Sequence, residues 1–231
     1  MAKQKDACDL SSCLMCRLCI KEWLPAIDAQ RTNLHFKKGD LLFREDTEVT
    51  GMYFVFSGTV KVHKHWGKEK ELIVRFARKG DIVGHRGLGG DNLYPVSGTA
   101  LEPVTACFIS LDFFYSTLKV NPGFMTQLML FYAQELKESE RNMRNLAHMH
   151  VKGRVANALL QLQQKFGVHA EGFINILLSR QDIASYAGTT YETVFRIMTE
   201  LVQESLLRVE GKQITLLRPE KLRLLTAVEE E

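Results

Sequence analysis

The sequence lacks the features of a membrane protein or a secreted protein. The 231-residue chain contains no run of about 18 apolar residues, and no apolar segment follows its polar first residues, so we expect no secretion signal. Only five cysteines are present, and four of them lie within twelve residues, whereas a disulfide framework would spread them through the fold. We therefore expect a cytoplasmic protein with no membrane partner, whose thiols stay reduced and available as ligands.

Signals of an enzyme and of a strongly basic surface are also missing. There is no glycine-rich phosphate loop, nucleophile elbow or carboxylate pair in a catalytic context, so the sequence does not predict an enzyme. The formal net charge of +3 is too small to indicate nucleic-acid binding by itself. With 45% hydrophobic residues, the chain can bury one large core or two small ones.

The clustered cysteines predict a metal centre. Cys8, Cys13, Cys16 and Cys19 are separated by gaps of four, two and two residues, and Cys107 lies alone far downstream. An iron-sulfur cluster takes four cysteine ligands, which three of the N-terminal cysteines and Cys107 would supply. The alternatives are a structural zinc site with four cysteine ligands, a cluster held by the four N-terminal cysteines alone, or thiols without a metal.

The region from Leu34 to about Leu118 predicts a β domain. Short apolar segments alternate with glycine-containing turns at intervals typical of a small barrel or jelly roll. The expected strands are residues 41–43, 52–56, 59–63, 71–76, 81–84 and 106–110.

A long helix is predicted after Asn121. Residues 124–151 contain no glycine, and their apolar residues recur mostly at intervals of three, four or seven. This stripe consists of Met125, Leu128, Tyr132, Leu136, Met143 and Leu146. Such a helix either packs its stripe on its own β domain or pairs with a second copy in a two-stranded coiled coil, and its length favours the homodimer.

The C-terminal region predicts a winged helix-turn-helix. A helix over residues 153–166 ends at Gly167, and Ser179 to Asp182 form a capping box that opens a second helix ending at Gly188. Residues 189–192 are expected to form another capping box, which opens a third helix. Two short helices joined by a glycine turn make a helix-turn-helix, and residues 206–209 and 213–217 are expected to form a β-hairpin wing.

The residue pattern of the third helix predicts that one of its faces contacts DNA bases. Its inner stripe consists of Val194, Ile197, Met198 and Leu201. Glu192, Phe195, Arg196 and Thr199 then share the opposite face. Glu192 could accept from cytosine, Arg196 could donate to guanine, and Phe195 could contact a thymine methyl group. The alternative is an ordinary ion pair between Glu192 and Arg196, beside a phenylalanine packed on a neighbouring helix.

Together these motifs resemble the CRP/FNR family of transcription regulators. The resemblance is strongest in Val151-Lys-Gly-Arg154-Val-Ala-Asn-Ala-Leu-Leu and from Ser179-Arg-Gln-Asp-Ile-Ala to Glu192-Thr-Val-Phe-Arg196. It implies an α+β fold with an N-terminal cyclic-nucleotide-binding-like β roll (a jelly roll), a long dimerisation helix and a C-terminal winged helix-turn-helix. The expected segments are 1–33 (cysteine-rich), 34–120 (β roll), 121–151 (dimerisation helix) and 152–231 (DNA-binding domain).

The resemblance also implies roles for the third helix. In the family, the glutamate and arginine of this helix read a G·C pair in a palindromic half-site with a TGA-like core, so Glu192 and Arg196 are the expected readers. Phe195 stands where the family often has a small residue. Thr199, Tyr191 and Arg180 are further candidates for contact with double-stranded DNA. The expected partners are a second copy of the chain and, for an activator, RNA polymerase.

The effector implied by the resemblance is not a cyclic nucleotide. Cyclic-nucleotide binders of the family use a Gly-Glu pair for the ribose and an Arg-Ser or Arg-Thr pair for the phosphate, whereas this chain has Gly84-His85 and Pro95-Val96-Ser97. The oxygen-regulating branch holds a [4Fe-4S] cluster with three N-terminal cysteines and one cysteine of the β roll. This branch implies Cys107 as the β-roll ligand.

The N-terminal run departs from that branch, because it has two-residue gaps and a fourth cysteine, so the resemblance leaves open which three bind. We predict Cys13, Cys16 and Cys19 as ligands beside Cys107 because of their even two-residue gaps, with Cys8, nearest the terminus, as an alternative ligand. Zinc with an unknown small-molecule effector, or an electron-transfer role for the cluster, are the competing interpretations. The histidines, including His63, His65, His85, His148 and His150, are expected to be exposed or hydrogen-bonded, because none shows ligand spacing with a second candidate.

Overall fold

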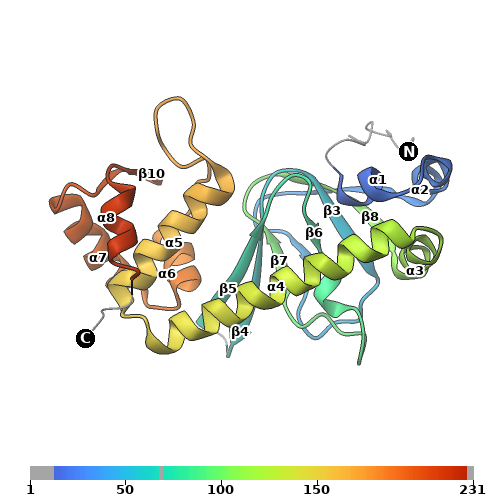
Figure 1. Cartoon of the computed structure of the whole chain (residues 1–231), viewed down its shortest axis with the longest axis horizontal. Helices are drawn as coiled ribbons and strands as arrows, with labels where there is room; N and C mark the ends of the chain where they lie inside the picture. Colours follow the sequence, from blue (N-terminus) through green and yellow to red (C-terminus); the bar gives the residue numbers. More distant parts are fainter. Residues whose placement is uncertain (1–12, 68–69, 228–231) are drawn as a thin grey trace. The chain divides into compact units, whose positions relative to one another are not determined.

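The chain divides into two compact units, Met1–Leu136 and Lys137–Glu231. The computed structural model (Figure 1) describes residues 13–67 and 70–227, so the alternative ligand Cys8 lies outside the described residues. Among the described helices, none combines the length and the apolar character that a bilayer span requires.

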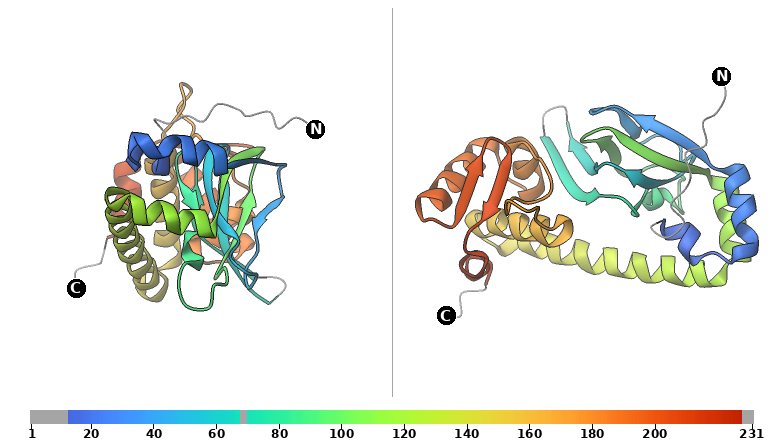
Figure 2. Two further views of the ribbon diagram at one scale, coloured as in Figure 1. Left: turned by 90° about the vertical axis from the view of Figure 1, so that its right-hand side faces the viewer. Right: turned by 90° about the horizontal axis from the view of Figure 1, so that it is seen from above.

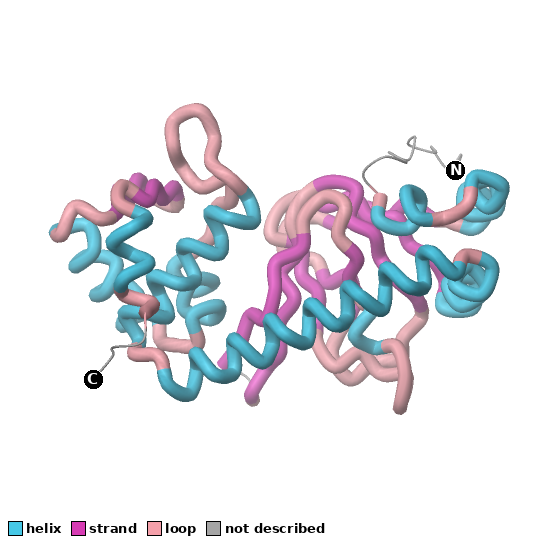
Figure 3. Tube along the Cα trace, in the orientation of Figure 1, coloured by secondary structure: helices cyan, strands magenta, loops and turns pink. Residues whose placement is uncertain are grey.

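The first unit contains a β roll made of two four-stranded sheets (Figures 2 and 3). One sheet has the strand order β1-β8-β3-β6 and the other has the order β2-β7-β4-β5, with every neighbouring pair antiparallel. The strands are β1 (Thr32–Phe36), β2 (Leu41–Phe43), β3 (Gly51–Ser57), β4 (Val60–Trp66), β5 (Lys70–Ala77), β6 (Ile82–Val83), β7 (Ser97–Ala100) and β8 (Val104–Ser110). All six expected strands are present, whereas β1 and β7 were not anticipated from the sequence.

Aromatic side chains fill the space between the two sheets. The ring of Phe43 on β2 lies 5.7 Å from that of Tyr53 on β3 and 4.6 Å from that of Tyr94. Tyr53 in turn lies 5.1 Å from Phe108 on β8. Successive side chains of a strand point to opposite faces, so Cys107, which precedes Phe108, faces away from this core.

Short helices cover the outer face of the sheet that contains β8. They are α1 (Leu14–Leu18), η1 (Lys21–Trp23), α2 (Leu24–Gln30) and α3 (Leu111–Val120), and Figure 1 shows α1 beside β3 and β8. Phe54 pairs in register with Cys107, and its ring lies 6.5 Å from that of Phe114 on α3. The outer face of β8 is therefore an apolar surface beneath helices.

The long helix α4 (Pro122–His148) has two apolar stripes. In the first unit, Phe124 and Leu128 are 0% and 5% exposed and pack into the core of the β roll. Met125, Met129 and Leu136 are at least 50% exposed and lie on a different side of the helix, because each residue advances the helix by about 100°. The sequence-predicted stripe mixed these two sets, since Leu128 belongs to the buried one.

The second unit contains five helices and a β-hairpin in its described part. Besides the end of α4, these are α5 (Val151–Phe166), α6 (Arg180–Ala187), α7 (Tyr191–Gln203), β9 (Leu207–Glu210), β10 (Gln213–Leu216) and α8 (Pro219–Leu224). The capping box of Ser179 and Asp182 is formed as predicted. Gly188 ends α6 in the left-handed conformation, at φ 63°.

One helix start was predicted wrongly. Helix α7 is capped by Thr190, whose hydroxyl accepts a hydrogen bond from the backbone N–H of Thr193. The expected box of Thr189 and Glu192 is therefore shifted by one residue, because two adjacent threonines offered alternative caps. The apolar stripe of Val194, Ile197, Met198 and Leu201 is buried as predicted.

Candidate functional site

The exposed face of α7 presents the predicted DNA-contact residues. Tyr191, Glu192, Phe195, Arg196 and Thr199 are all exposed, while the opposite stripe of the same helix is buried. The Thr199 hydroxyl donates to the Phe195 carbonyl at 2.9 Å, a back-bond that leaves the rest of the face available. The helix-turn-helix thus holds one polar and aromatic helix face toward solvent.

Arg196 is paired with a residue that sequence reasoning did not consider. Its Nη1 donates to Glu200 Oε1 at 2.8 Å, one turn toward the C-terminus, rather than to Glu192. Glu200 also lies 3.8 Å from Lys152 Nζ, which donates to Glu204 at 2.7 Å. Because the Arg196 side chain is 66% exposed, this pair contributes little stability and can be exchanged for a base contact.

Phe195 remains on the surface instead of packing into a neighbouring helix. It is 51% exposed, and its ring stacks on Tyr191 at 6.4 Å with an interplanar angle of 22°. The guanidinium of Arg180, at the start of α6, lies 5.7 Å from the centre of the Phe195 ring. The structure therefore brings Arg180, Tyr191 and Phe195 together as one cationic and aromatic surface beside Arg196.

The N-terminal cysteines lie along one short helix. Cys13 is the N-cap of α1, Cys16 lies within it and Cys19 is its C-cap, so the three-residue spacing places them on one side of the helix. Each is 8% exposed or less. The next residues dock on α3: the Ile20 N–H donates to Asn121 Oδ1 at 2.8 Å, and Trp23 Nε1 donates to Thr117 Oγ1 at 3.1 Å.

Cys107 is buried within the same hydrophobic cluster as these three cysteines. It is 5% exposed, on the outer face of β8. Burial, and secondarily the charge of Cys13, raises the pKa of the Cys19 thiol to about 12. A thiol in this setting binds as a thiolate only when a cation replaces its proton. The donor set is thus four buried thiols, a ligand chemistry that fits a soft metal centre.

The two candidate metal centres require different distances between the cysteine sulfurs. In a tetrahedral zinc site with Zn–S bonds of about 2.3 Å, the sulfurs lie about 3.8 Å apart. Within the described part of the chain, no three of these cysteines bring their sulfurs within 4.8 Å of one another. A four-iron cluster needs wider spacing, because each cysteine binds a different iron atom.

The segment that would hold a cyclic nucleotide contains a charge network instead. Arg86 Nη2 donates to Glu135 Oε2 of α4 at 2.8 Å, and Arg75 lies 3.5 Å from the same carboxylate. Burial alone would raise the pKa of Glu135, yet its contacts with His85, Arg75 and Arg86 hold it well below the usual value. His85 is 2% exposed, and burial lowers its pKa. Arg75 also lies 3.5 Å from Asp81, so the two guanidinium groups face two carboxylates.

Sequence reasoning missed one side-chain group. His63 and His65 on β4 and Glu71 on β5 place their ligand atoms within 4.8 Å of one another. The two histidines were interpreted separately, because only the pairing of β4 with β5 brings Glu71 beside them. His63 is not exposed but 3% accessible, and it contacts Thr99.

Comparisons with known proteins place these features in a family. Residues 33–121 match the family model described as cyclic nucleotide-binding domain, and residues 153–225 match the Crp-like helix-turn-helix domain. The transcriptional activator protein FnrA of Stutzerimonas stutzeri is 29% identical over 215 residues, covering 91% of this chain and 87% of FnrA. The transcriptional activator protein Anr of Pseudomonas protegens is 30% identical over 190 residues, covering 80% of this chain and 77% of Anr.

A solved structure supports the same assignment at the level of the fold. The structure of FixK2 from Bradyrhizobium japonicum has a TM-score of 0.77 and 24% identity, and the match covers 87% of this chain and 99% of that chain. The predicted fold class is confirmed, as is the prediction of a DNA-binding regulator rather than an enzyme. The chain belongs to the CRP/FNR family of DNA-binding transcription regulators.

Proposed function

We propose that this regulator is a cytoplasmic homodimer that senses oxygen or redox state through a [4Fe-4S] cluster bound by Cys13, Cys16, Cys19 and Cys107. The observation that carries the proposal is the burial of all four thiols in one apolar cluster, three on α1 and one on β8. Four cysteine thiolates are the ligand set that a four-iron cluster takes. A bound cluster would supply a redox-active centre at the outer face of the β roll.

Ligation would fix the N-terminal segment against β8 and α3. The contacts of Ile20 with Asn121 and of Trp23 with Thr117 and Phe113 already hold this segment on α3, with the Trp23 and Phe113 rings stacked at 5.8 Å. Asn121 is the residue immediately before α4. Loss of the thiolate ligands would weaken this docking and change the environment of the start of α4, which biases a two-state equilibrium.

The exposed stripe of α4 supports the homodimer. Met125, Met129 and Leu136, and Met143 in the second unit, are 50–63% exposed. Their intervals of four and seven residues are those of a coiled-coil seam. Tyr132, at the intervening position, packs on the β roll, where its hydroxyl donates to the His85 carbonyl. Large apolar residues in such a row are costly to leave in water, so a second copy of the same helix is the partner that this surface fits.

DNA recognition would use the exposed face of α7. We propose that Glu192 and Arg196 read a G·C pair, that Phe195 and Tyr191 contact neighbouring bases or sugars, and that Thr199 and Arg180 contact the backbone. Two such helices in a homodimer would read a palindromic site with TGA-like half-sites, and an activator would also contact RNA polymerase. The opposed burial and exposure of the two α7 faces supports this assignment.

Anaerobic metal analysis of single cysteine variants tests the proposal. We expect wild-type protein to be brown, to contain iron and sulfide, and to bind a cognate palindrome. Serine at position 13, 16, 19 or 107 should abolish iron, sulfide and specific DNA binding together. Cys8→Ser is the matched control and should retain most of all three.

The outcomes separate the competing functions. Colourless wild-type protein with stoichiometric zinc would replace the cluster by a zinc site and leave the effector to be a small molecule. DNA binding that is equally tight with the cluster intact, oxidised or lost would favour electron transfer over sensing. Full iron in Cys107→Ser would show that the N-terminal cysteines form the complete ligand set.

A further inference from the structure

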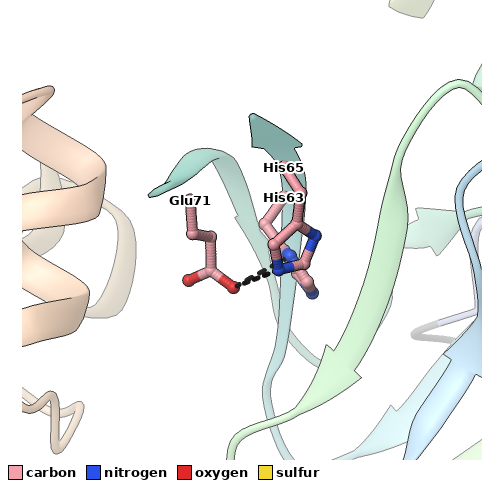
Figure 4. A group of neighbouring side chains, drawn as sticks. All are labelled: His63, His65 and Glu71. Carbon is pink, nitrogen blue, oxygen red and sulfur yellow. Dashed lines mark ion pairs between the residues drawn. The ribbon is translucent and has the colours of Figure 1, made fainter. Parts of the chain in front are cut away.

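His63, His65 and Glu71 converge near the turn end of the β4–β5 hairpin (Figure 4). His65 and Glu71 are direct cross-strand partners, and His63 lies two residues before His65 on the same face of β4. A register shift between Val62 and His63 interrupts the ladder at this point. Such bulges re-aim side chains, and here the bulge lies beside the three converging residues.

The distances suit a small cation. His63 Nδ1 lies 2.9 Å and His65 Nε2 lies 3.7 Å from Glu71 Oε2. In a tetrahedral site with metal–nitrogen bonds of about 2.0–2.1 Å, neighbouring ligand atoms are separated by about 3.3 Å. The observed distances lie on either side of that value, so small side-chain adjustments would complete the geometry.

The environment of His63 leaves one ring nitrogen directed at the group. His63 is 3% exposed, and its Nε2 lies 2.7 Å from Thr99 Oγ1 on β7. When Nε2 donates this bond, Nδ1 keeps its lone pair, and this buried nitrogen faces Glu71 Oε2 at 2.9 Å. An outer hydrogen bond that fixes the ring and its tautomer is the usual support of a metal-binding histidine.

The Glu71 carboxylate is already paired with the ammonium group of Lys61. Lys61 Nζ lies 2.7 Å and 3.1 Å from the two oxygens of Glu71. The same carboxylate also faces His63 Nδ1 at 2.9 Å. A divalent ion would take the place of Lys61 at one carboxylate oxygen.

We propose that His63, His65 and Glu71 bind one borderline divalent cation of the Zn²⁺, Co²⁺ and Ni²⁺ class. Two imidazoles and one carboxylate suit these ions, whereas Mg²⁺ and Ca²⁺ prefer oxygen ligands. The His65 side chain is 44% exposed, so water completes the coordination. The site is separate from the cysteines and clips β4 to β5 next to the hairpin turn at Gly67.

Competitive Zn²⁺ titration of the full chain against a chromogenic chelator tests the site. Cysteine thiolates are zinc ligands in general, so the measured quantity is the difference between wild type and variants that share all five cysteines. We expect His65→Asn and Glu71→Gln each to bind one equivalent fewer than wild type. Thr99→Val, which removes only the outer hydrogen bond, should bind the same number with affinity reduced about tenfold.

Lys61→Gln is the discriminating variant. Removal of the competing cation from Glu71 should tighten Zn²⁺ binding about two- to fivefold, as expected for one partly exposed ion pair. His35→Asn, on β1 and outside the group, should bind as wild type does. Circular dichroism melts of the metal-free variants verify that each has folded.

Three results would overturn the proposal. The first is an unchanged number of bound Zn²⁺ ions in His65→Asn. The second is one bound Zn²⁺ ion fewer in His65→Asn but not in Glu71→Gln. The third is an unchanged Zn²⁺ affinity in Lys61→Gln. Iron and sulfide should be equal in all of these variants, so failure here is distinguishable from failure of the cysteine centre.

Discussion

Replacement of Arg196 by alanine should separate specific from non-specific DNA binding. The Arg196–Glu200 pair is exposed and joins residues one helical turn apart, so it contributes about 0.3–0.5 kcal/mol to stability and its loss leaves the fold intact. A bidentate contact with guanine discriminates by about 1–3 kcal/mol. We therefore expect Arg196→Ala to weaken binding to the cognate palindrome about 5- to 150-fold.

Gel-shift titrations on the cognate palindrome and on a scrambled duplex measure this effect. Binding to the scrambled duplex, which depends on phosphate contacts, should change little. Glu200→Gln is the matched control, because it removes the ionic partner and keeps Arg196; it should bind cognate DNA as wild type does or up to about twofold more tightly. Equal losses of Arg196→Ala on both duplexes would reduce Arg196 to a phosphate contact and refute the reasoning.

Three further outcomes are expected. Calorimetry should show no binding of cyclic AMP at physiological concentration, because Arg86 is engaged by Glu135 and Pro95-Val96-Ser97 has no arginine where the family's phosphate-binding pair stands; saturable low-micromolar binding would contradict this. Leu136→Glu should dissociate the homodimer in analytical ultracentrifugation, whereas Gln127→Glu, on another side of α4, should not. Burial raises the pKa of Tyr186 from 10.0 to about 12, so the native state disfavours ionisation and stability is lost as pH rises through this range. In denaturant titrations, the free energy of unfolding of Tyr186→Phe should fall less steeply with rising pH than that of the wild type.

The helix-turn-helix was predictable because its signals are local. The capping box of Ser179 and Asp182, the stop at Gly188 and the buried stripe of α7 depend on residues within one or two helical turns. The error at Thr190 is of the same local kind, since the neighbouring Thr189 could cap equally well. The strands β1 and β7 were missed for another reason. The sequence Ser-Gly-Thr-Ala of β7 has little strand propensity, and pairing with β2 and β4 imposes its conformation.

The sequence indicated which residue types form the candidate sites, but it did not indicate how the fold arranges them. Cysteine spacing indicated a metal, but it could not show that α1 would place three thiols on one side and that β8 would bury Cys107 against α3. Glu71 was missed beside His65 because strand register, not sequence proximity, makes them neighbours. The pairing of Arg196 with Glu200 rather than with Glu192 depends on side-chain rotamers and on the position of Lys152, which a helical repeat cannot specify.

The charge network of the β roll includes Glu135 of α4, and the cysteine segment contacts Asn121, the residue before α4. Glu135 of α4 holds Arg75 and Arg86, so the interior surface that would accept a charged ligand is closed by compensated charges. In the proposed function, a signal would enter on the outer face, where Ile20 of the cysteine segment contacts Asn121, the residue before α4. A family that keeps α4 and the helix-turn-helix can change its effector by altering side chains of the β roll alone, which is why the match to a cyclic nucleotide-binding domain describes the fold of residues 33–121 without specifying their ligand.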